Sequence, residues 1–313
     1  MKKLLFMAAC LTMFIMTKAQ QDPMFSQNMF NHVTVNPAFA GMKGILSVSA
    51  VYRTQWQNMT DAPEIYAVNV DAPFSIKNTN NGIGINLLNE KIGLQNNSQL
   101  MLNYAFKGDL GWGMLNVGTK LGILQLKFDN DFYIPEMDGN TDPGSDPALN
   151  TSELSKIKFD VGIGVFLTGN NFYAGASLTH LTKPSMTVGT SGEFFWKQSL
   201  NLTSGYNIPL SPVIKMQPSF FLQSDFVSNQ YILNANFTYK ETYWAGLSYR
   251  YESTVTFIGG LELKNGLQLG YSYDMNWDKI ASDLGGSHEI TLSYTFGLSL
   301  GKKDKVYKSI RFL

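Results

Sequence analysis

Apolar and polar positions alternate along most of the chain beyond residue 43. Between residues 287 and 297, for example, Ile290, Leu292 and Tyr294 fall on one face, and Thr291 and Ser293 fall on the other. A period of two is typical of a β-strand with one apolar face. The alternation predicts fourteen strands, at residues 44–56, 64–74, 82–91, 98–107, 112–124, 158–168, 172–181, 195–207, 213–224, 230–240, 243–251, 254–263, 266–275 and 287–297.

The lengths of these segments and of their connections indicate a membrane barrel. Most segments are roughly nine to thirteen residues long, about the length that a tilted strand needs to cross a bilayer. The short connection 169–171 contains Gly-Asn, and Asn265 of the short connection 264–265 forms an Asn-Gly pair with Gly266. The long connections 125–157, 182–194 and 276–286 all fall at the opposite end. This parity predicts an all-β, antiparallel transmembrane barrel over residues 44–300, with short turns in the periplasm and long loops outside.

Composition supports a membrane barrel over a soluble all-β domain such as a sandwich or a propeller. Charged residues make up only 15% of the chain, against about 25% in a typical soluble domain, and aromatic residues make up 13%. The tryptophans fall at the ends of the predicted strands or in loops, where an interfacial aromatic girdle belongs. They are Trp56, Trp112, Trp196, Trp244 and Trp277.

The start of the chain has the pattern of a secretory signal peptide over residues 1–19. Lys2 and Lys3 precede an apolar run from Leu4 to Met16, and small residues surround the position before Gln20. A lipoprotein signal that ends at Cys10 is the alternative, but it leaves a short apolar core. Cys10 is the only cysteine, so a mature chain from Gln20 has no disulfide, thiolate metal site or cysteine nucleophile.

Charge and motifs offer no evidence for an enzyme, a cofactor or nucleic-acid binding. Lys2, Lys3 and Lys18 lie in the predicted signal peptide, and without them the chain has 21 basic and 24 acidic residues, a net charge of −3. This charge gives no indication of nucleic-acid binding. The histidines, including His180 and His288, lie outside any activated-nucleophile motif. The Gly-x-Gly pieces lie inside predicted strands and lack the third glycine of a nucleotide-binding loop. We therefore expect a protein without catalytic, cofactor or metal residues.

The long outer connection contains the only spacing that resembles a metal loop. Asp138, Asn140 and Asp142 have the first three spacings of a calcium loop, but Pro143 replaces its glycine and Leu149 replaces its bidentate acid. A solvated acidic loop is the preferred interpretation, and calcium binding is the alternative. The three residues are outer-loop candidates for contact with a partner, because a loop of this length is uncommon unless it is functional or disordered.

Charged residues at lumen positions have both signs. Arg53, Lys107, Lys120, Lys197 and Lys215 alternate onto the predicted inner face, as do Glu90, Glu262, Asp274 and Glu289. Confined charges need partners. Mixed signs therefore indicate a filled or plugged interior at least as much as an open pore.

An ordered set of short motifs resembles the PorP/SprF family of type IX secretion system outer-membrane proteins. The motifs are Gln21-Asp22-Pro23-x-Phe25-Ser26-Gln27, Met29-Phe30, Asn36-Pro37-Ala38-x-Ala40-Gly41, Tyr52-Arg53-x-Gln55-Trp56, Ala62-Pro63, Gly82-Ile83-Gly84, Asn89-Glu90-Lys91-Ile92-Gly93, Leu247-Ser248-Tyr249-Arg250-Tyr251, Leu269-Gly270-Tyr271-Ser272-Tyr273-Asp274 and Gly285-Gly286-Ser287-His288-Glu289-Ile290. Each motif is short, and the specificity lies in their order over almost the whole mature chain.

The resemblance implies a non-enzymatic barrel in the outer membrane of a Gram-negative bacterium, surrounded by outer-membrane lipid. It implies a role in type IX protein secretion, gliding motility and cell-surface attachment of adhesins. The implied partners are an exported protein with a type IX C-terminal domain and periplasmic ring or lipoprotein components. A passive diffusion channel and a soluble secreted adhesin are the alternatives.

The segment before the first strand is the most specific part of the resemblance. We expect residues 20–43 to lie on the periplasmic side and residues 301–313 to form a basic tail. The segment either docks to a partner or folds back into the barrel mouth, and the plainer interpretation is that it packs its aromatic residues against the barrel's inner end. The partner-binding candidates are Asp22, Pro23, Phe25, Ser26, Gln27, Met29, Phe30, Asn36, Pro37, Arg53, Gln55 and Trp56.

Overall fold

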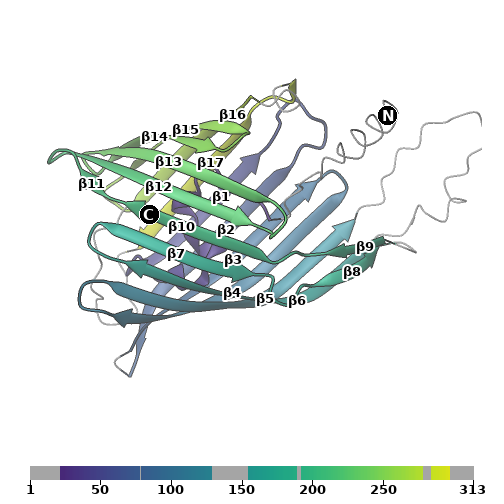
Figure 1. Cartoon of the computed structure of the whole chain (residues 1–313), viewed down its shortest axis with the longest axis horizontal. Helices are drawn as coiled ribbons and strands as arrows, with labels where there is room; N and C mark the ends of the chain where they lie inside the picture. The colour runs from purple at the N-terminus through teal and green to yellow at the C-terminus, as the bar shows by residue number, and fades with distance from the viewer. Residues whose placement is uncertain (1–21, 78, 129–153, 189–191, 278–282, 297–313) are drawn as a thin grey trace, which may run out of the picture.

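The computed structural model is a closed antiparallel β-barrel of fourteen strands (Figure 1). It describes residues 22–77, 79–128, 154–188, 192–277 and 283–296. Each strand pairs with its sequence neighbours, β1 pairs with β17, and β10 pairs with β12, so the sheet has no open ends. The predicted signal peptide, the tail at 301–313 and the loop residues Asp138, Asn140 and Asp142 lie outside the described residues.

The wall strands match the fourteen predicted segments in number and order. Their bounds are β1 Leu46–Thr54, β2 Glu64–Ile76, β3 Thr79–Ile92, β4 Gln95–Asp109, β5 Met114–Phe128, β6 Leu154–Thr168, β7 Phe172–Thr179, β10 Ser199–Tyr206, β12 Ile214–Ser224, β13 Asn229–Tyr239, β14 Tyr243–Arg250, β15 Thr254–Glu262, β16 Leu267–Asn276 and β17 Ser287–Phe296. The prediction of an all-β antiparallel barrel is confirmed.

Smaller elements lie before and beside the wall. Three short helical turns precede β1, namely η1 Asn28–Phe30, α2 His32–Val35 and η2 Pro37–Phe39. A hairpin of β8 Ser185–Val188 and β9 Gly192–Phe195 separates β7 from β10, and β11 Ile208–Pro209 continues the line of β10 and pairs with β12.

Among the described residues, no helix combines the length and the apolarity that crossing a membrane requires.

The two ends of the barrel differ in the length of their connections. At one end, here called the turn end, residues 77–78, 110–113, 169–171, 240–242 and 263–266 join successive strands. At the other end, here called the loop end, the long connections 55–63, 129–153, 180–198 and 277–286 are found. In Figure 1 the β8–β9 hairpin lies at the loop end, beside the ends of β5 and β6. This asymmetry agrees with the predicted parity.

The strand period separates an apolar outer face from a polar inner face. Outward side chains such as Leu102, Val117 and Leu247 are about half exposed, and inward positions such as Asn103 and Asn116 are buried. An outer face of this kind is what a lipid-exposed barrel surface requires. The inner face is polar but not open to water, because another part of the chain fills it.

Residues 22–43 lie inside the barrel and not beneath it. Asp22 contacts His180 at the loop end, and Gly41 contacts β2 and β3 near the turn end before β1 begins. The segment joins β1 at the turn end, and the position of residues 20–43 on the periplasmic side stays a prediction. The described part runs up the lumen because polar groups of the wall hydrogen-bond it along its length. We call residues 22–43 the plug.

Close contact between the plug and the wall requires glycine at some lumen positions. A Cβ atom built on Gly82 of β3 would overlap the carbonyl oxygen of Ala40, and one on Gly41 would approach the carbonyl oxygen of Ala72 to 2.7 Å. Gly41 also has a φ of +65°, a conformation that glycine adopts without a steric penalty. Gly82 in particular is predictable only once the plug's position is known.

We predict that Gly82→Ala displaces the turn-end part of the plug while the barrel stays folded. The new methyl group overlaps backbone atoms, which cannot move as a side-chain end does. Labelling of a Met29→Cys variant with a maleimide is expected to rise when Gly82→Ala is added, with unchanged heat-modifiable migration on gels. Gly108→Ala is the control, since a Cβ atom there lies 3.5 Å from the carbonyl oxygen of Leu115, which is an ordinary contact. Equal labelling of Met29→Cys with and without Gly82→Ala contradicts the prediction.

Candidate functional site

The turn-end half of the plug is held by hydrogen bonds to its backbone. Asn116 donates to the carbonyl oxygen of Ala38 (3.0 Å), and Lys107 donates to that of Gly41 (2.6 Å). Asp71 accepts from the Gly41 amide (2.9 Å). The side chain of Asn36 caps η2 by accepting from the Ala38 amide, and its amide group donates to carbonyl oxygens of β6 and β7. The wall thus supplies the partners that an irregular buried backbone needs.

The middle of the plug is held by amide and hydroxyl side chains. Asn69 donates to the side-chain oxygen of Asn31 (2.6 Å), and Ser177 donates to the carbonyl oxygen of Val35 (2.7 Å). Lys120 approaches the carbonyl oxygen of Thr34 at 3.4 Å. These contacts come from β2, β5 and β7, so strands from different sectors of the wall hold the plug.

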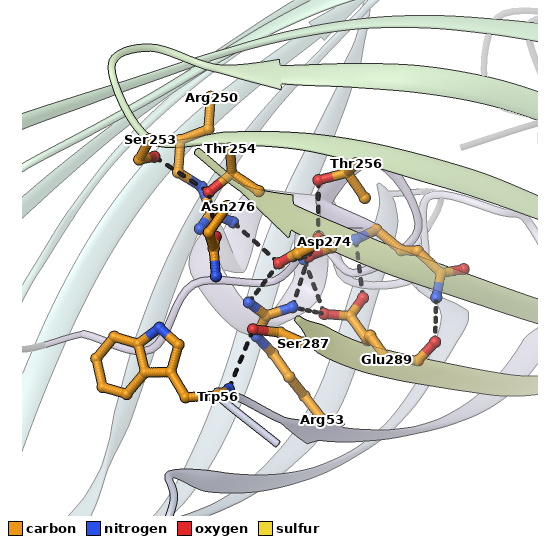
Figure 2. Close-up of polar contacts among 12 residues, drawn as sticks. Arg53, Trp56, Arg250, Ser253, Thr254, Thr256, Asp274, Asn276, Ser287 and Glu289 are labelled. Carbon is orange, nitrogen blue, oxygen red and sulfur yellow. Dashed lines mark hydrogen bonds and ion pairs between the residues drawn. The ribbon is translucent and has the colours of Figure 1, made fainter. Parts of the chain in front are cut away.

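Toward the loop end, a buried charge cluster binds two consecutive plug residues (Figure 2). Arg53 lies 2.7 Å from Asp274 and 3.4 Å from Glu289, and all three are about 1% exposed. The Glu289 carboxylate accepts the backbone amides of Ser26 (2.7 Å) and Gln27 (2.8 Å). The Ser26 hydroxyl accepts from Arg53 and donates to Asp274 (2.6 Å). We call Arg53, Asp274 and Glu289 the clamp.

The clamp joins β1, β16 and β17 to the plug through charge-assisted hydrogen bonds. Such bonds are stronger than neutral ones, and the planar guanidinium of Arg53 reaches both carboxylates at once. Thr256 donates to Asp274 (2.8 Å), and Arg250 lies 3.9 Å from it (Figure 2). Two carboxylates and two guanidinium groups therefore balance in charge within the buried cluster.

A second charged contact holds the beginning of the plug at the loop end. The ring of His180 lies between Asp22 (2.9 Å) and Asp160 (2.8 Å), and we call these three residues the latch. Burial alone would lower the pKa of His180, but the two carboxylates raise it to about 9. His180 is therefore charged at neutral pH. Lys120 and Glu90 are the other charged groups that act on Asp22.

Apolar side chains of the plug pack against lumen-facing apolar residues. Phe25 packs in a cluster with Val51, Ile65 and Leu88, while Phe39 packs with Phe166 and Tyr173 near the turn end. Met29 contacts Trp244, whose ring centre lies 4.6 Å from that of Phe30. These contacts are those of a packed interior, with the aromatic residues facing the wall.

With the plug in place, the lumen around its beginning holds little free space. A cavity of about 20 Å³ remains beside Asp22, Thr34 and Lys120. That volume is enough for about one water molecule. A passage for solutes along this part of the lumen requires the plug to move.

The sequence-predicted candidates divide into three groups by position. Asp22, Pro23, Phe25, Ser26, Gln27, Met29, Phe30, Asn36 and Pro37 belong to the plug, and Arg53 belongs to the clamp. Gln55 and Trp56 lie at the loop-end rim, where their amides bond to Pro63 and Ser287. Asp138, Asn140 and Asp142 lie outside the described residues. Whether any of these residues binds a partner stays a prediction.

Several residues that hold the plug were not among the candidates. Asp160, Asn69, Asn116 and Ser177 are examples, and Asp274 and Glu289 were predicted only to face the lumen. The available signal was a polar residue at an inward position of an alternating strand. That signal identifies the face but not the partner, because the partner lies far away in the sequence.

One known protein family matches most of this chain in sequence. The sequence profile of the family described as type IX secretion system membrane protein PorP/SprF matches residues 17–294. The chain belongs to the PorP/SprF family. The match spans the plug, the first thirteen wall strands and β17 as far as Tyr294. As a PorP/SprF protein, the chain is a membrane protein of type IX secretion, and none of the curated proteins matches it.

Solved barrels share only a distant likeness with this PorP/SprF protein. It is 14% identical to the CymD monoaromatic hydrocarbon channel, over 90% of this chain and 95% of that one, with a TM-score of 0.47. It is 11% identical to the Pseudomonas putida toluene transporter TodX, over 81% and 88%, with a TM-score of 0.46. It is 8% identical to a mutant of Rh. blastica porin, over 80% of this chain and 99% of that one, with a TM-score of 0.34. We base no argument on these likenesses.

We predict that Arg53→Met lowers the free energy of unfolding by about 3–5 kcal/mol, because it leaves the buried Glu289 without its ion-pair partner and Asp274 with only Arg250, 3.9 Å away. Denaturant unfolding in micelles, followed by tryptophan fluorescence, measures the loss. Lys215→Met is the control: the pair of Lys215 with Glu241 is partly exposed, so its loss is expected to cost less than about 1 kcal/mol. Similar losses in the two variants would argue against the clamp.

The latch predicts a pH-dependent stability. The pKa of His180 rises from 6.5 to about 9 on folding, so its stabilisation is complete below about pH 6.5 and is lost as the pH rises through about 9. At pH below about 6.5, the free energy of unfolding of the wild type is expected to exceed that of His180→Gln by on the order of 2 kcal/mol. This difference is expected to shrink toward pH 10. His288→Gln is the matched control, since that ring bonds the neutral side chains of Tyr271 and Gln57. If the difference in free energy of unfolding between wild type and His180→Gln stays constant across this pH range, the predicted role of the latch is wrong.

Proposed function

We propose that this barrel lies in the outer membrane of a Gram-negative bacterium and serves type IX secretion by binding proteins. In this role it assists the export or cell-surface anchoring of secreted proteins such as adhesins, and it catalyses no reaction. Membership of the PorP/SprF family supports the link to type IX secretion. The plugged lumen is the observation that favours a binding protein over a passive diffusion channel.

The two ends of the barrel suit two kinds of partner. In this proposal the loop end faces the outside and contacts the C-terminal domain of an exported protein. The turn end faces the periplasm, where ring or lipoprotein components of the secretion machinery contact it. The plug connects the two ends through the lumen, from Asp22 at the loop end to Gly41 near the turn end.

Deletion of the gene tests the secretion role. Surface proteomics of the deletion strain is expected to show the loss of at least one exported adhesin from the cell surface, and wild-type complementation is expected to restore it. Unchanged amounts of other outer-membrane proteins provide the control for membrane integrity. If every exported adhesin still reaches the surface and stays there, the proposed role is wrong.

Conductance in planar bilayers separates the binding role from a diffusion channel. The wild-type protein is expected to give no large steady openings, because the plug occupies the lumen. Arg53→Met, which weakens the clamp, is expected to raise the frequency of openings, and Lys215→Met is the matched control. Large, steady openings of the wild-type protein would favour the diffusion channel.

A further inference from the structure

The wall strand β6 extends well beyond its neighbour β7 at the loop end. The two strands are in register only from Ile163, which pairs with Leu178, to Thr168. Beyond Thr179 the chain turns at His180, whose φ of +54° is in the left-handed region, and its ring enters the latch. Beyond the latch, the outer half of β6 pairs with no wall strand among the described residues, and β8 approaches it without forming a ladder.

The connection after β7 covers only part of this edge. The Leu181 amide donates to the carbonyl oxygen of Val161 (3.0 Å), and the Thr182 hydroxyl donates to that of Phe159 (3.1 Å). Because successive residues of a strand point their backbone groups to opposite sides, Ser155 and Ile157 direct theirs away from β5 as Val161 does. Within the described ranges, no strand pairs with β6 on this side between residues 155 and 159.

This edge crosses the upper boundary of the apolar outer face. Phe159 is in register with Ile123 of β5, which pairs in turn with Leu100 of β4, so this row is apolar. In the next row toward the loop end, Ile157 pairs with Gln125, which pairs with Ser98. A backbone edge that is unpaired at the border of the lipid is costly, because water satisfies it only on one side of the border.

The side chains along the edge alternate in character. Ile157 and Phe159 face outward and are 60% and 57% exposed. Lys156 and Lys158 are exposed on the opposite face, in the same alternation as the buried Asp160. Protected edge strands carry prolines, bulges or charges on their exposed faces. Lys156 and Lys158 are such charges and disfavour pairing with a neutral or basic strand. A strand with acidic residues at the facing positions would match them, and its apolar residues would match the outward face.

We propose that residues 155–159 of β6 are a docking edge for an extended segment of another protein, in which acidic residues alternate with apolar ones. Added as a strand, such a segment pairs its backbone with Ser155 and Ile157. Its acidic residues lie beside Lys156 and Lys158, and its apolar residues lie beside Ile157 and Phe159.

The test uses the full-length protein in nanodiscs and a fluorescein-labelled peptide in which glutamate and valine alternate over seven residues. Fluorescence anisotropy is expected to show saturable binding, and hydrogen exchange is expected to slow in the fragment that covers residues 155–159. A peptide of the same composition, with its glutamates in one block and its valines in another, is expected to bind roughly tenfold more weakly, because it cannot place both kinds of side chain on their matching faces.

Two variants separate the backbone edge from general charge. Ile157→Pro removes an amide that points away from β5, so the barrel keeps its ladder while the edge loses a donor; affinity is expected to fall at least roughly fivefold. The affinity of the double variant Lys156→Glu, Lys158→Glu for the alternating peptide is expected to fall roughly tenfold. Lys91→Glu, at an exposed position, is the matched control.

Retained heat-modifiable migration verifies that each variant is folded. Absence of saturable binding to the wild-type protein overturns the proposal. So does equal binding by both peptides, or wild-type affinity in a folded Ile157→Pro variant.

Discussion

The burial of an irregular backbone inside the barrel is the constraint on which the rest of this structure depends. Residues 22–43 form only single helical turns, so they satisfy few of their own N–H and C=O groups. The lumen offers little water, and each unpaired group there would destabilise the fold. The inward positions of the wall therefore carry amides, hydroxyls and charges, several of which hydrogen-bond the plug backbone.

The clamp combines this backbone requirement with electrostatics. Glu289 accepts two successive amides, and a carboxylate at such a depth needs a cation beside it. Arg53 meets this need for Glu289 and Asp274 together, which a lysine ammonium on a flexible stem would do less well. The contact is also local to one side of the barrel, so the remaining wall can hold the plug through neutral groups such as Asn69 and Asn116.

The strands were predictable from sequence because their signal is local. Alternation with a period of two identifies which residues face out, and turn chemistry separates the two ends. The course of the plug was not predictable in the same way, since no period indicates which lumen group meets residue 26 or 38. The plug joins β1 at the turn end, but the segment's path depends on contacts such as Ser26 with Glu289, which are 263 positions apart in the chain. Glycines such as Gly82 become interpretable only after that path is known.

The position of the clamp has a consequence for assembly. Arg53 belongs to β1, and Asp274 and Glu289 belong to β16 and β17, so its three members come together where the first and last strands of the wall meet. Before that seam forms, Ser26 and Gln27 have no complete set of partners. Closing the cylinder and fixing the N-terminal segment within it are thus coupled events. The seam between the first and last strands is therefore also where the N-terminal segment gains its charged partners.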